Sequence, residues 1–280
     1  MRDIGADRIV SEVARLCIEA CTEPEPDLTA ALEAALGREE SEAGKEVLRE
    51  IIENNRIAAR EKMPMCQDTG FTVAFVELGQ EVHITGKSLT DAVNEGVRRG
   101  YTEGYLRKSI VAHPFRRENT KDNTPAIVHI EIVPGDSLRI LVAPKGGGSE
   151  NMSTVRMMTP ADGYEGVKKF VVDWVRTAGA NPCPPVTVGV GIGGTFEFAA
   201  LIAKKAALRR IGLHSSDSQN AKMEEELLTE INKLGIGPQG YGGRVTALAV
   251  NVETYPCHIA SLPVAVNIQC HSARHKEVTL

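Results

Sequence analysis

The amino-acid sequence predicts a single α+β domain, in which a helical N-terminal region precedes a core of antiparallel and mixed sheets. Apolar side chains recur with helical periodicity through the first 61 residues, and later segments alternate apolar and polar side chains, as half-buried strands do. No linker rich in Pro, Gly or Ser and no internal repeat divides the chain. We therefore expect one domain at 1–280, with a helical subregion at 1–61 and an α+β core at 62–280.

Three helices are expected in the N-terminal region. Pro24 and Pro26 interrupt the periodicity after the first helix, because proline lacks the backbone N–H that a helix interior uses. Cys17 and Cys21 lie one helical turn apart on the apolar stripe of that first helix, so we expect both to be small buried side chains. The predicted helices span residues 6–22, 27–37 and 42–61.

The core begins with a strand-like run at 71–76 and a helix that Ser88 introduces. Two alternating segments, 128–132 and 138–143, flank the turn sequence PGDS at 134–137, which predicts an antiparallel hairpin. The rest of the core is expected to contain further helices and strands. The predicted helices are 161–178, 195–209 and 218–233, and the predicted strands are 186–188, 245–252 and 262–270.

Composition narrows the class of protein. The net charge of −5 argues against a nucleic-acid-binding surface, which needs a basic face. No apolar run approaches the ~20 residues of a membrane span, and the acid-bearing N-terminus lacks the apolar region of a secretory signal. We expect a cytoplasmic protein, in which the six cysteines serve as metal ligands, catalytic groups or core residues rather than in disulfides.

Three lone cysteines stand in unusual surroundings. Cys66 lies within PMCQDTG at 64–70, Cys183 lies within NPCPP at 181–185, and Cys270 closes an alternating strand. Iron–sulfur clusters are held mainly by sets of four Cys thiolates, so a set of three leaves one iron free to act as a Lewis acid. Zinc sites more often contain a CxxC pair, which this chain lacks. Burial of all three cysteines in the core stays an alternative.

Two glycine-rich segments are candidate ligand contacts. The GxGxxG pattern at 189–194 is typical of a dinucleotide-binding turn, but it occurs late in the chain and lacks the acidic residue expected about 20 positions further on. A tight strand-to-helix turn and an anion site at a helix N-terminus are the alternatives. The sequence KGGGSEN at 145–151 suits either close approach of the backbone to a ligand or a flexible exit from a strand.

Three charged or titratable side chains are further candidates. Arg107 is suited to clamping a carboxylate with two parallel hydrogen bonds, although a solvated basic loop has the same composition. Asp68 lies two residues from a candidate cluster ligand. A carboxylate beside a metal site is energetically unfavourable unless it takes part in the chemistry or is paired with a partner. His258, next to Cys257 between two strands, is either an acid–base group or a structural histidine.

Together these motifs resemble the class I, iron–sulfur fumarate hydratase family. More narrowly, they resemble the α-subunit of its two-subunit form, which is shared with L(+)-tartrate dehydratase. The resemblance covers nearly the whole chain. It rests on the segments 65–70, 119–126, 145–151, 181–185 and 189–195 and on Cys270.

The resemblance implies a [4Fe–4S] cluster bound by Cys66, Cys183 and Cys270, with the substrate on the fourth iron. Cys257 has no family role and is expected to be a packing residue. The implied catalytic residues are His258 and Asp68, and the implied substrate-binding residues are Gln67, Asp68, Arg107, Lys145, Gly147 and Gly148.

The implied reaction is reversible addition of water to fumarate, giving L-malate. Single-chain members of the family continue into a second domain, which supplies further arginine and lysine residues and a threonine proposed as the base. These residues lie outside this sequence, so we expect a separate β-subunit in a symmetric hetero-oligomer and little activity from this chain alone. Three alternatives stay open: the same chemistry on tartrate, a non-catalytic iron–sulfur scaffold subunit, and a nucleotide-binding oxidoreductase.

Overall fold

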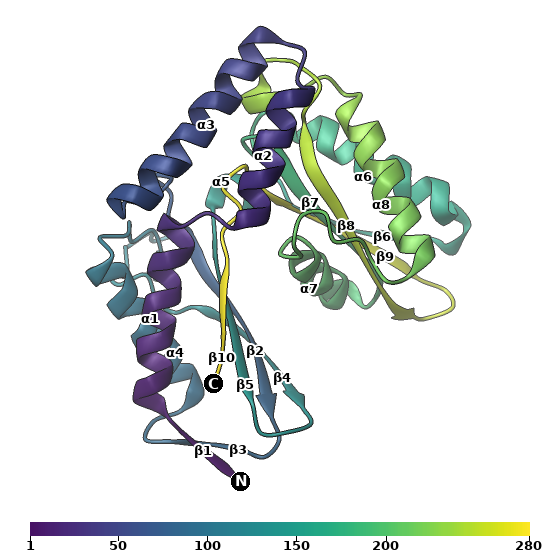
Figure 1. Ribbon diagram of the computed structural model, residues 1–280. Helices are drawn as coiled ribbons and strands as arrows, with labels where there is room; N and C mark the ends of the chain where they lie inside the picture. The colour runs from purple at the N-terminus through teal and green to yellow at the C-terminus, as the bar shows by residue number, and fades with distance from the viewer. The chain divides into compact units, whose positions relative to one another are not determined.

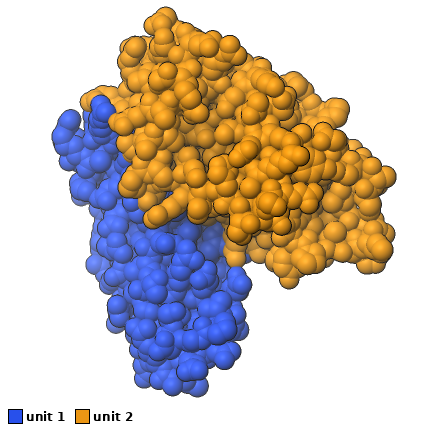
Figure 2. Space-filling view, turned by 45° about the vertical axis from the view of Figure 1, so that its right-hand side comes forward, with its two compact units in different colours: residues 1–24, 55–147, 274–280 blue, residues 25–54, 148–273 orange.

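The computed structural model describes the whole chain of 280 residues and confirms the α+β class. Its contacts separate the chain into two compact units (Figure 2). Unit 1 comprises residues 1–24, 55–147 and 274–280, and unit 2 comprises residues 25–54 and 148–273. Because each unit is assembled from separate stretches of chain, no linker marks a boundary in the sequence. The expected N-terminal helical region is divided between the two units.

The main elements of unit 1 are α1 (Ala6–Thr22), α4 (Leu89–Glu103), β1 (Arg2–Gly5), β2 (Phe71–Gly79), β3 (Val82–Thr85), β4 (Ile127–Val133), β5 (Leu138–Lys145) and β10 (Lys276–Thr279). Four strands form a sheet in the order β10-β5-β2-β4, and its apolar side chains pack against α1 and α4 (Figure 1). The two helices approach closely, because a Cβ at Gly96 of α4 would lie only 2.6 Å from Cβ of Val13 in α1. A small parallel pair, β1 with β3, completes unit 1.

The antiparallel hairpin predicted from residues 128–132 and 138–143 is wrong. β2 lies between the two strands, pairing in parallel with β4 and antiparallel with β5. Side-chain alternation identifies a strand but not its neighbour. The residues from Val73 to Val76 in β2 are all at most 9% exposed, and a strand that is buried on both faces belongs in the middle of a sheet. The more exposed β4 therefore takes the edge.

The main elements of unit 2 are α2 (Pro26–Arg38), α5 (Gly147–Glu150), β6 (Thr154–Met158), α6 (Gly163–Ala178), β7 (Val186–Gly194), α7 (Phe196–Ala206), α8 (Ser218–Asn232), β8 (Ala247–Cys257) and β9 (Leu262–Gln269). Helix α3 (Glu42–Glu61) belongs to unit 2 up to residue 54 and to unit 1 beyond it. The sheet order is β6-β9-β7-β8. Helices α6 and α8 cover one face of this sheet and α7 covers the other (Figure 1). Helices α2 and α3 share a separate apolar cluster with Val245 and Leu248.

The GxGxxG pattern lies inside β7. The strand was predicted to end at residue 188, but it continues to Gly194, so the dinucleotide-binding turn is wrong. The tight strand-to-helix turn is present only at the end of the pattern, where Gly193 and Gly194 have positive φ and α7 begins at Phe196. The glycines instead make room for α7. A Cβ at Gly189 would overlap the carbonyl oxygen of Ala203, and a Cβ at Gly191 would overlap that of Ala199. These glycines let a helix backbone lie directly on the strand.

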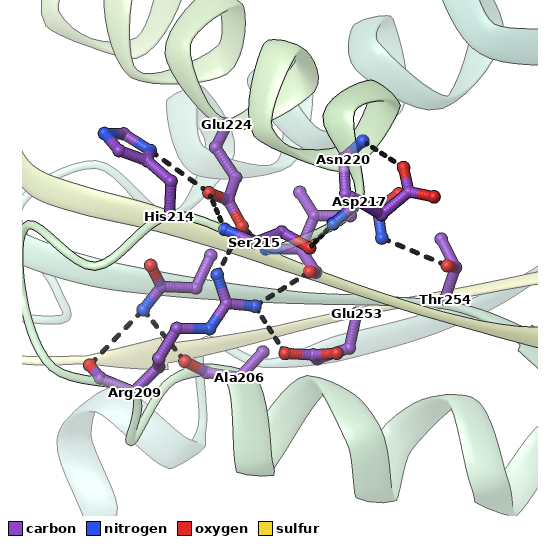
Figure 3. Close-up of polar contacts among 11 residues, drawn as sticks. Ala206, Arg209, His214, Ser215, Asp217, Asn220, Glu224, Glu253 and Thr254 are labelled. Atoms are coloured by element: carbon purple, nitrogen blue, oxygen red, sulfur yellow. Dashed lines mark hydrogen bonds and ion pairs between the residues drawn. The ribbon is translucent and has the colours of Figure 1, made fainter.

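A buried polar network ties α8 to β8 and to the segment after α7 (Figure 3). The side chain of Glu224 in α8 is 1% exposed. Its carboxylate accepts hydrogen bonds from Nη1 of Arg209 at 2.5 Å and from the backbone N of Val252 at 2.8 Å. The same carboxylate accepts from the backbone N of Ser215 at 3.1 Å and lies 3.3 Å from Nδ1 of His214. These bonds fix the loop that follows α7 against the sheet.

Substitution of the β7 glycines tests the close packing of α7. Gly189→Ala and Gly191→Ala should each destabilise the protein by about 1–3 kcal/mol, because the added methyl group must displace the helix backbone. Gly37→Ala in α2 is the matched control: nothing lies within 4 Å of its Cβ position, so it should be neutral or stabilise by up to about 1 kcal/mol. Urea unfolding measures the differences, and equal stability of all three variants would contradict this packing.

Removing the charge of Glu224 tests the buried network. Glu224→Gln should cost about 2–4 kcal/mol, because the amide nitrogen would face backbone donors and Arg209 would lose its buried anionic partner. Glu225→Gln, an exposed neighbour on the same helix, should change stability by less than about 0.5 kcal/mol. Unfolding midpoints of the two variants would reveal the contrast, and a neutral Glu224→Gln would show that the network adds little.

Candidate functional site

The loop at 66–70 is held against the rest of unit 1 by its backbone. The backbone N of Met65, just before the loop, donates to the carbonyl of Cys21 at 2.9 Å. Gly70 has a φ of +81°, and a Cβ there would lie 2.8 Å from the backbone N of Lys145. Only glycine fits both the left-handed backbone and the close approach to the end of β5.

Buried side chains satisfy the carbonyl groups at the end of this loop. The hydroxyl of Tyr101 donates to the carbonyl of Thr69 at 2.6 Å and approaches that of Gly70 at 3.2 Å. Nδ2 of Asn123, which is fully buried, also donates to the carbonyl of Gly70 at 3.2 Å. Burial raises the pKa of Tyr101 well above its usual value, so the hydroxyl remains a donor at physiological pH. The loop therefore has a defined conformation before any ligand binds.

Asp68 uses both of its carboxylate oxygens to join the loop to the glycine segment after β5. Oδ1 accepts from the backbone N of Gly70 at 2.9 Å, and Oδ2 accepts from the backbone N of Gly147 at 2.7 Å. The structure thus brings together two of the predicted site residues. The segment 145–151, which the sequence suggested to be a glycine-rich loop, is mostly regular structure: β5 runs to Lys145 and the short helix α5 begins at Gly147.

The other predicted residues of unit 1 surround this loop. The side chains of Gln67 and Arg107 are exposed, and Oε1 of Gln67 lies 3.3 Å from Sγ of Cys66. The carbonyl of Arg107 accepts from Oγ1 of Thr69 at 2.9 Å, which fixes the Arg107 backbone beside the loop. Lys145 is only 3% exposed, and its Nζ lies 3.5 Å from the carbonyl of Gly146.

Arg274 is not among the site residues that the sequence predicts. This side chain is 3% exposed, and its Nη1 donates to the carbonyl of Asp68 at 2.5 Å. Arginine is seldom fully buried unless its charge is paired, and the burial of Arg274 is not visible in the polar C-terminal sequence. The one available signal was its position four residues after Cys270.

In unit 2, the backbone around Cys183 is restrained from both sides. Cys183 has a φ of +56°, and its backbone N donates to the carbonyl of Ala180 at 3.0 Å. Prolines fix the residues before and after it. Gly148 borders the same loop, since a Cβ at Gly148 would lie 3.8 Å from the carbonyl of Asn181. The side chain of Cys183 is exposed.

Cys270 lies beside the Cys183 loop. It follows β9, whose last residue, Gln269, pairs with Thr187 at the beginning of β7. The backbone N of His271 donates to the carbonyl of Cys183 at 3.2 Å. Two of the three predicted cluster ligands therefore lie at the same end of the unit 2 sheet.

A broad hollow of about 810 Å³ in unit 2 is lined in part by His271, the residue after Cys270. One face of α3 lines it together with Gln239, Tyr241 and His271. His271 follows Cys270 directly, and both the backbone N and Nε2 of Gln239 donate to the carbonyl of Pro184. Neither cysteine itself lines the hollow.

His258, expected at the active site, lies at the opposite end of the same sheet. It follows Cys257, which pairs with Gly194 at the end of β7, whereas Cys183 and Cys270 adjoin the beginning of β7. A strand of this length spans about 26 Å at roughly 3.3 Å per residue. The structure therefore does not bring His258 together with these two cysteines in unit 2. Nearness in sequence misleads here, because an entire strand separates His258 from Cys270.

The remaining cysteines differ in burial. Cys17 and Cys21 are buried, as predicted. Burial raises the pKa of Cys21 to about 11 and that of Cys17 further still. The expectation that Cys257 is a packing residue is wrong, because its side chain is exposed and its Sγ lies 3.3 Å from the carbonyl of Ser261. None of the six cysteines forms a disulfide.

Cys66, Cys183 and Cys270 have the donor chemistry of cluster ligands. Their thiols are at least partly exposed and free of disulfides, and the backbone at or beside each one is held in place. Within either unit, no group of three His, Cys, Asp or Glu side chains forms a ready metal-ion site. The three positions therefore suit thiolate ligation better than a nitrogen–oxygen metal site.

Comparison with known proteins places the chain among the hydro-lyases. Residues 10–279, almost the whole chain, match the model of the family described as fumarate hydratase (fumerase). The chain belongs to the fumarate hydratase family, and the resemblance noted in the sequence is confirmed. None of its helices combines the length and the apolar character needed to cross a membrane.

Relatives of known description span nearly the same length. A protein of Methanocaldococcus jannaschii described as "Putative L(+)-tartrate dehydratase subunit alpha" is 43% identical over 273 residues, which cover 95% of each chain. The L(+)-tartrate dehydratase subunit alpha of Escherichia coli strain UTI89 is 34% identical over 274 residues, covering 96% of this chain and 90% of its own. The protein of the same description from E. coli strain K12 is 33% identical over the same length.

Thiol alkylation tests this division of the cysteines. In cluster-free folded protein at neutral pH, Cys183 and Cys257 should react rapidly, whereas Cys17 and Cys21 should react only after unfolding. Burial raises the pKa of both helix thiols, so almost none of the reactive thiolate is present near neutral pH. Mass spectrometry of the labelled peptides measures each rate. Rapid labelling of Cys21 in the folded protein would contradict the packing of α1.

Proposed function

We propose that this chain is the α-subunit of an iron–sulfur hydro-lyase that interconverts fumarate and L-malate in a reducing, cytoplasmic compartment. The supporting observation is that a chain matching the fumarate hydratase family over residues 10–279 carries Cys66, Cys183 and Cys270 in accessible, backbone-restrained positions. The proposed cofactor is a [4Fe–4S] cluster held by these three thiolates. When bound, such a cluster supplies an open iron that polarises a substrate oxygen as a Lewis acid.

The chain's own residues would bind and orient the dicarboxylate. The exposed guanidinium of Arg107, with its backbone fixed by Thr69, would hold one carboxylate through two parallel hydrogen bonds. The amide of Gln67 would bind a second polar group next to Cys66. Lys145 would contribute a positive charge next to the glycine segment, where its Nζ lies near the carbonyl of Gly146. Fixed positions for these groups lower the entropy that the reaction must lose.

Asp68 is the proposed proton-handling group of this subunit. Its carboxylate oxygens accept hydrogen bonds from the backbone N of Gly70 and of Gly147, which fixes their direction. In this position the carboxylate would hold the backbone of Gly147 and Gly148 in a conformation that can bind substrate. The same carboxylate would accept a proton or transfer one during the reaction. We give His258 no role at the Cys183–Cys270 end of this subunit, because it lies at the other end of the sheet.

A separate β-subunit is proposed to complete the site in a symmetric hetero-oligomer. The two Escherichia coli relatives are described as subunits alpha. The β-subunit would supply the remaining cationic residues and the base that removes the proton from the carbon next to a carboxylate. Binding of the cluster by this chain and turnover by the complex are therefore separable properties.

Anaerobic reconstitution followed by a fumarate hydration assay tests the proposal. The chain should bind iron and acid-labile sulfide in equal amounts, and turnover should require the β-subunit and be lost on exposure to oxygen. Cys66→Ala should reduce the activity of the complex by roughly 100-fold or more, whereas Cys257→Ala, the exposed control, should not. Full turnover by the isolated chain, or normal activity of the Cys66→Ala complex, would refute the proposed division of roles.

L(+)-Tartrate is the second candidate substrate. It is favoured by the descriptions of the Escherichia coli relatives, which are named as L(+)-tartrate dehydratase subunits. The chemistry is the same: loss of water from a hydroxylated four-carbon diacid, here giving oxaloacetate. Comparison of kcat/KM for L-malate and L(+)-tartrate with the assembled enzyme separates the two, since a larger value for tartrate would reassign the substrate without changing the residues above.

A further inference from the structure

We infer that Arg274 is a positioning residue that locks the loop at 66–70 into the conformation in which Cys66 can bind a metal cluster. The cluster itself rests on the proposed function, whereas the effect of Arg274 on the loop does not. Arg274 touches the loop through the carbonyl of Asp68, two residues beyond Cys66. It would act on Cys66 through the backbone and without contact to the substrate.

The burial of Arg274 makes this contact strong. The residue is 3% exposed, and a guanidinium in such surroundings is destabilising unless its donors find acceptors. Nη1 donates to the carbonyl of Asp68 at 2.5 Å. A hydrogen bond from a charged donor is about twice as strong as one between neutral groups. Freeing the loop would therefore leave a buried cation without this acceptor.

Gly146 borders both the guanidinium of Arg274 and the carboxylate of Asp68. A Cβ at Gly146 would lie 3.2 Å from Nη2 of Arg274 and 3.4 Å from Oδ2 of Asp68. The same Oδ2 accepts from the backbone N of Gly147. Arg274, Asp68 and the glycine backbone thus form one assembly, in which the backbone carbonyl and the side chain of Asp68 are held by different partners.

The position of Arg274 in the chain links this assembly to the other thiols. Cys270 lies four residues before Arg274, and the backbone N of His271 between them donates to the carbonyl of Cys183. One short stretch therefore carries one proposed ligand, bonds to the loop of a second, and clamps the loop of the third.

The test compares Arg274→Gln with Arg274→Lys and with the control Arg2→Gln, which removes an exposed guanidinium. Arg2 also donates from a guanidinium to backbone carbonyls of unit 1, those of Asp136 and Leu280, but it does not touch the loop. In cluster-free protein, Arg274→Gln should raise amide hydrogen exchange at residues 66–70 and alkylation of Cys66 by about tenfold or more. Arg274→Lys should restore part of the protection, and Arg2→Gln should change neither property.

Cluster loading provides the second readout. After anaerobic reconstitution, Arg274→Gln should retain several-fold less iron and sulfide than the unaltered chain, with a weaker visible absorption spectrum. Gly146→Ala, which crowds the guanidinium without removing it, should show the same two effects in milder form. This second variant keeps the test decisive if Arg274→Gln folds poorly.

The outcomes separate the two proposals. Unchanged exchange at 66–70 and unchanged Cys66 alkylation in Arg274→Gln, with normal unfolding behaviour, would overturn the role of Arg274. A uniform rise in exchange across unit 1, with no restoration by lysine, would also overturn it, because Arg274 would then only stabilise the fold. If the unaltered chain takes up no iron, the proposed function fails, and loop exchange and alkylation still decide the role of Arg274.

Discussion

The candidate site depends on one constraint, the attachment of charged side chains to the backbone of the loop at 66–70. The carboxylate of Asp68 accepts from two backbone N–H groups, and the guanidinium of Arg274 donates to the carbonyl of Asp68. Tyr101 and Asn123 satisfy the carbonyls that follow. Because these partners come from α4, from the segment before β4 and from the C-terminal segment, the whole core of unit 1 contributes to the orientation of this one loop.

Glycine has two different uses in this chain, and both concern close approach. In β7, Gly189 and Gly191 let the backbone of α7 lie directly on the sheet, which is a matter of packing. In unit 1, Gly70 and Gly146 let the loop and the end of β5 meet, which brings Asp68, Gly147 and Arg274 within hydrogen-bond distance. The lack of a Cβ in glycine therefore allows close packing that stabilises the fold in unit 2, and it allows the contacts that form the candidate site in unit 1.

The fold also places the six cysteines in surroundings that differ in burial and therefore in thiol reactivity. Two of them lie inside α1, where burial raises their pKa values and keeps them unreactive. Cys66, Cys183 and Cys270 lie in or beside restrained loops with access to solvent, as ligands of an exchangeable metal group require. Cys257 is accessible too, but it stands with His258 at the far end of the sheet from Cys183 and Cys270, so exposure alone does not define the set.

The sequence by itself determined the α+β class, the longer helices to within a few residues, the burial of Cys17 and Cys21, and the family. Periodicity and composition encode these properties locally, and the family motifs are contiguous segments. Only the tertiary structure decided that β2 separates β4 from β5, that the GxGxxG segment is a strand, and that His258 lies far from Cys270. It also revealed Arg274, whose burial depends on segments more than 100 residues apart in sequence. Strand partners, close backbone contacts and the burial of a lone charge arise from long-range packing, which no local pattern records.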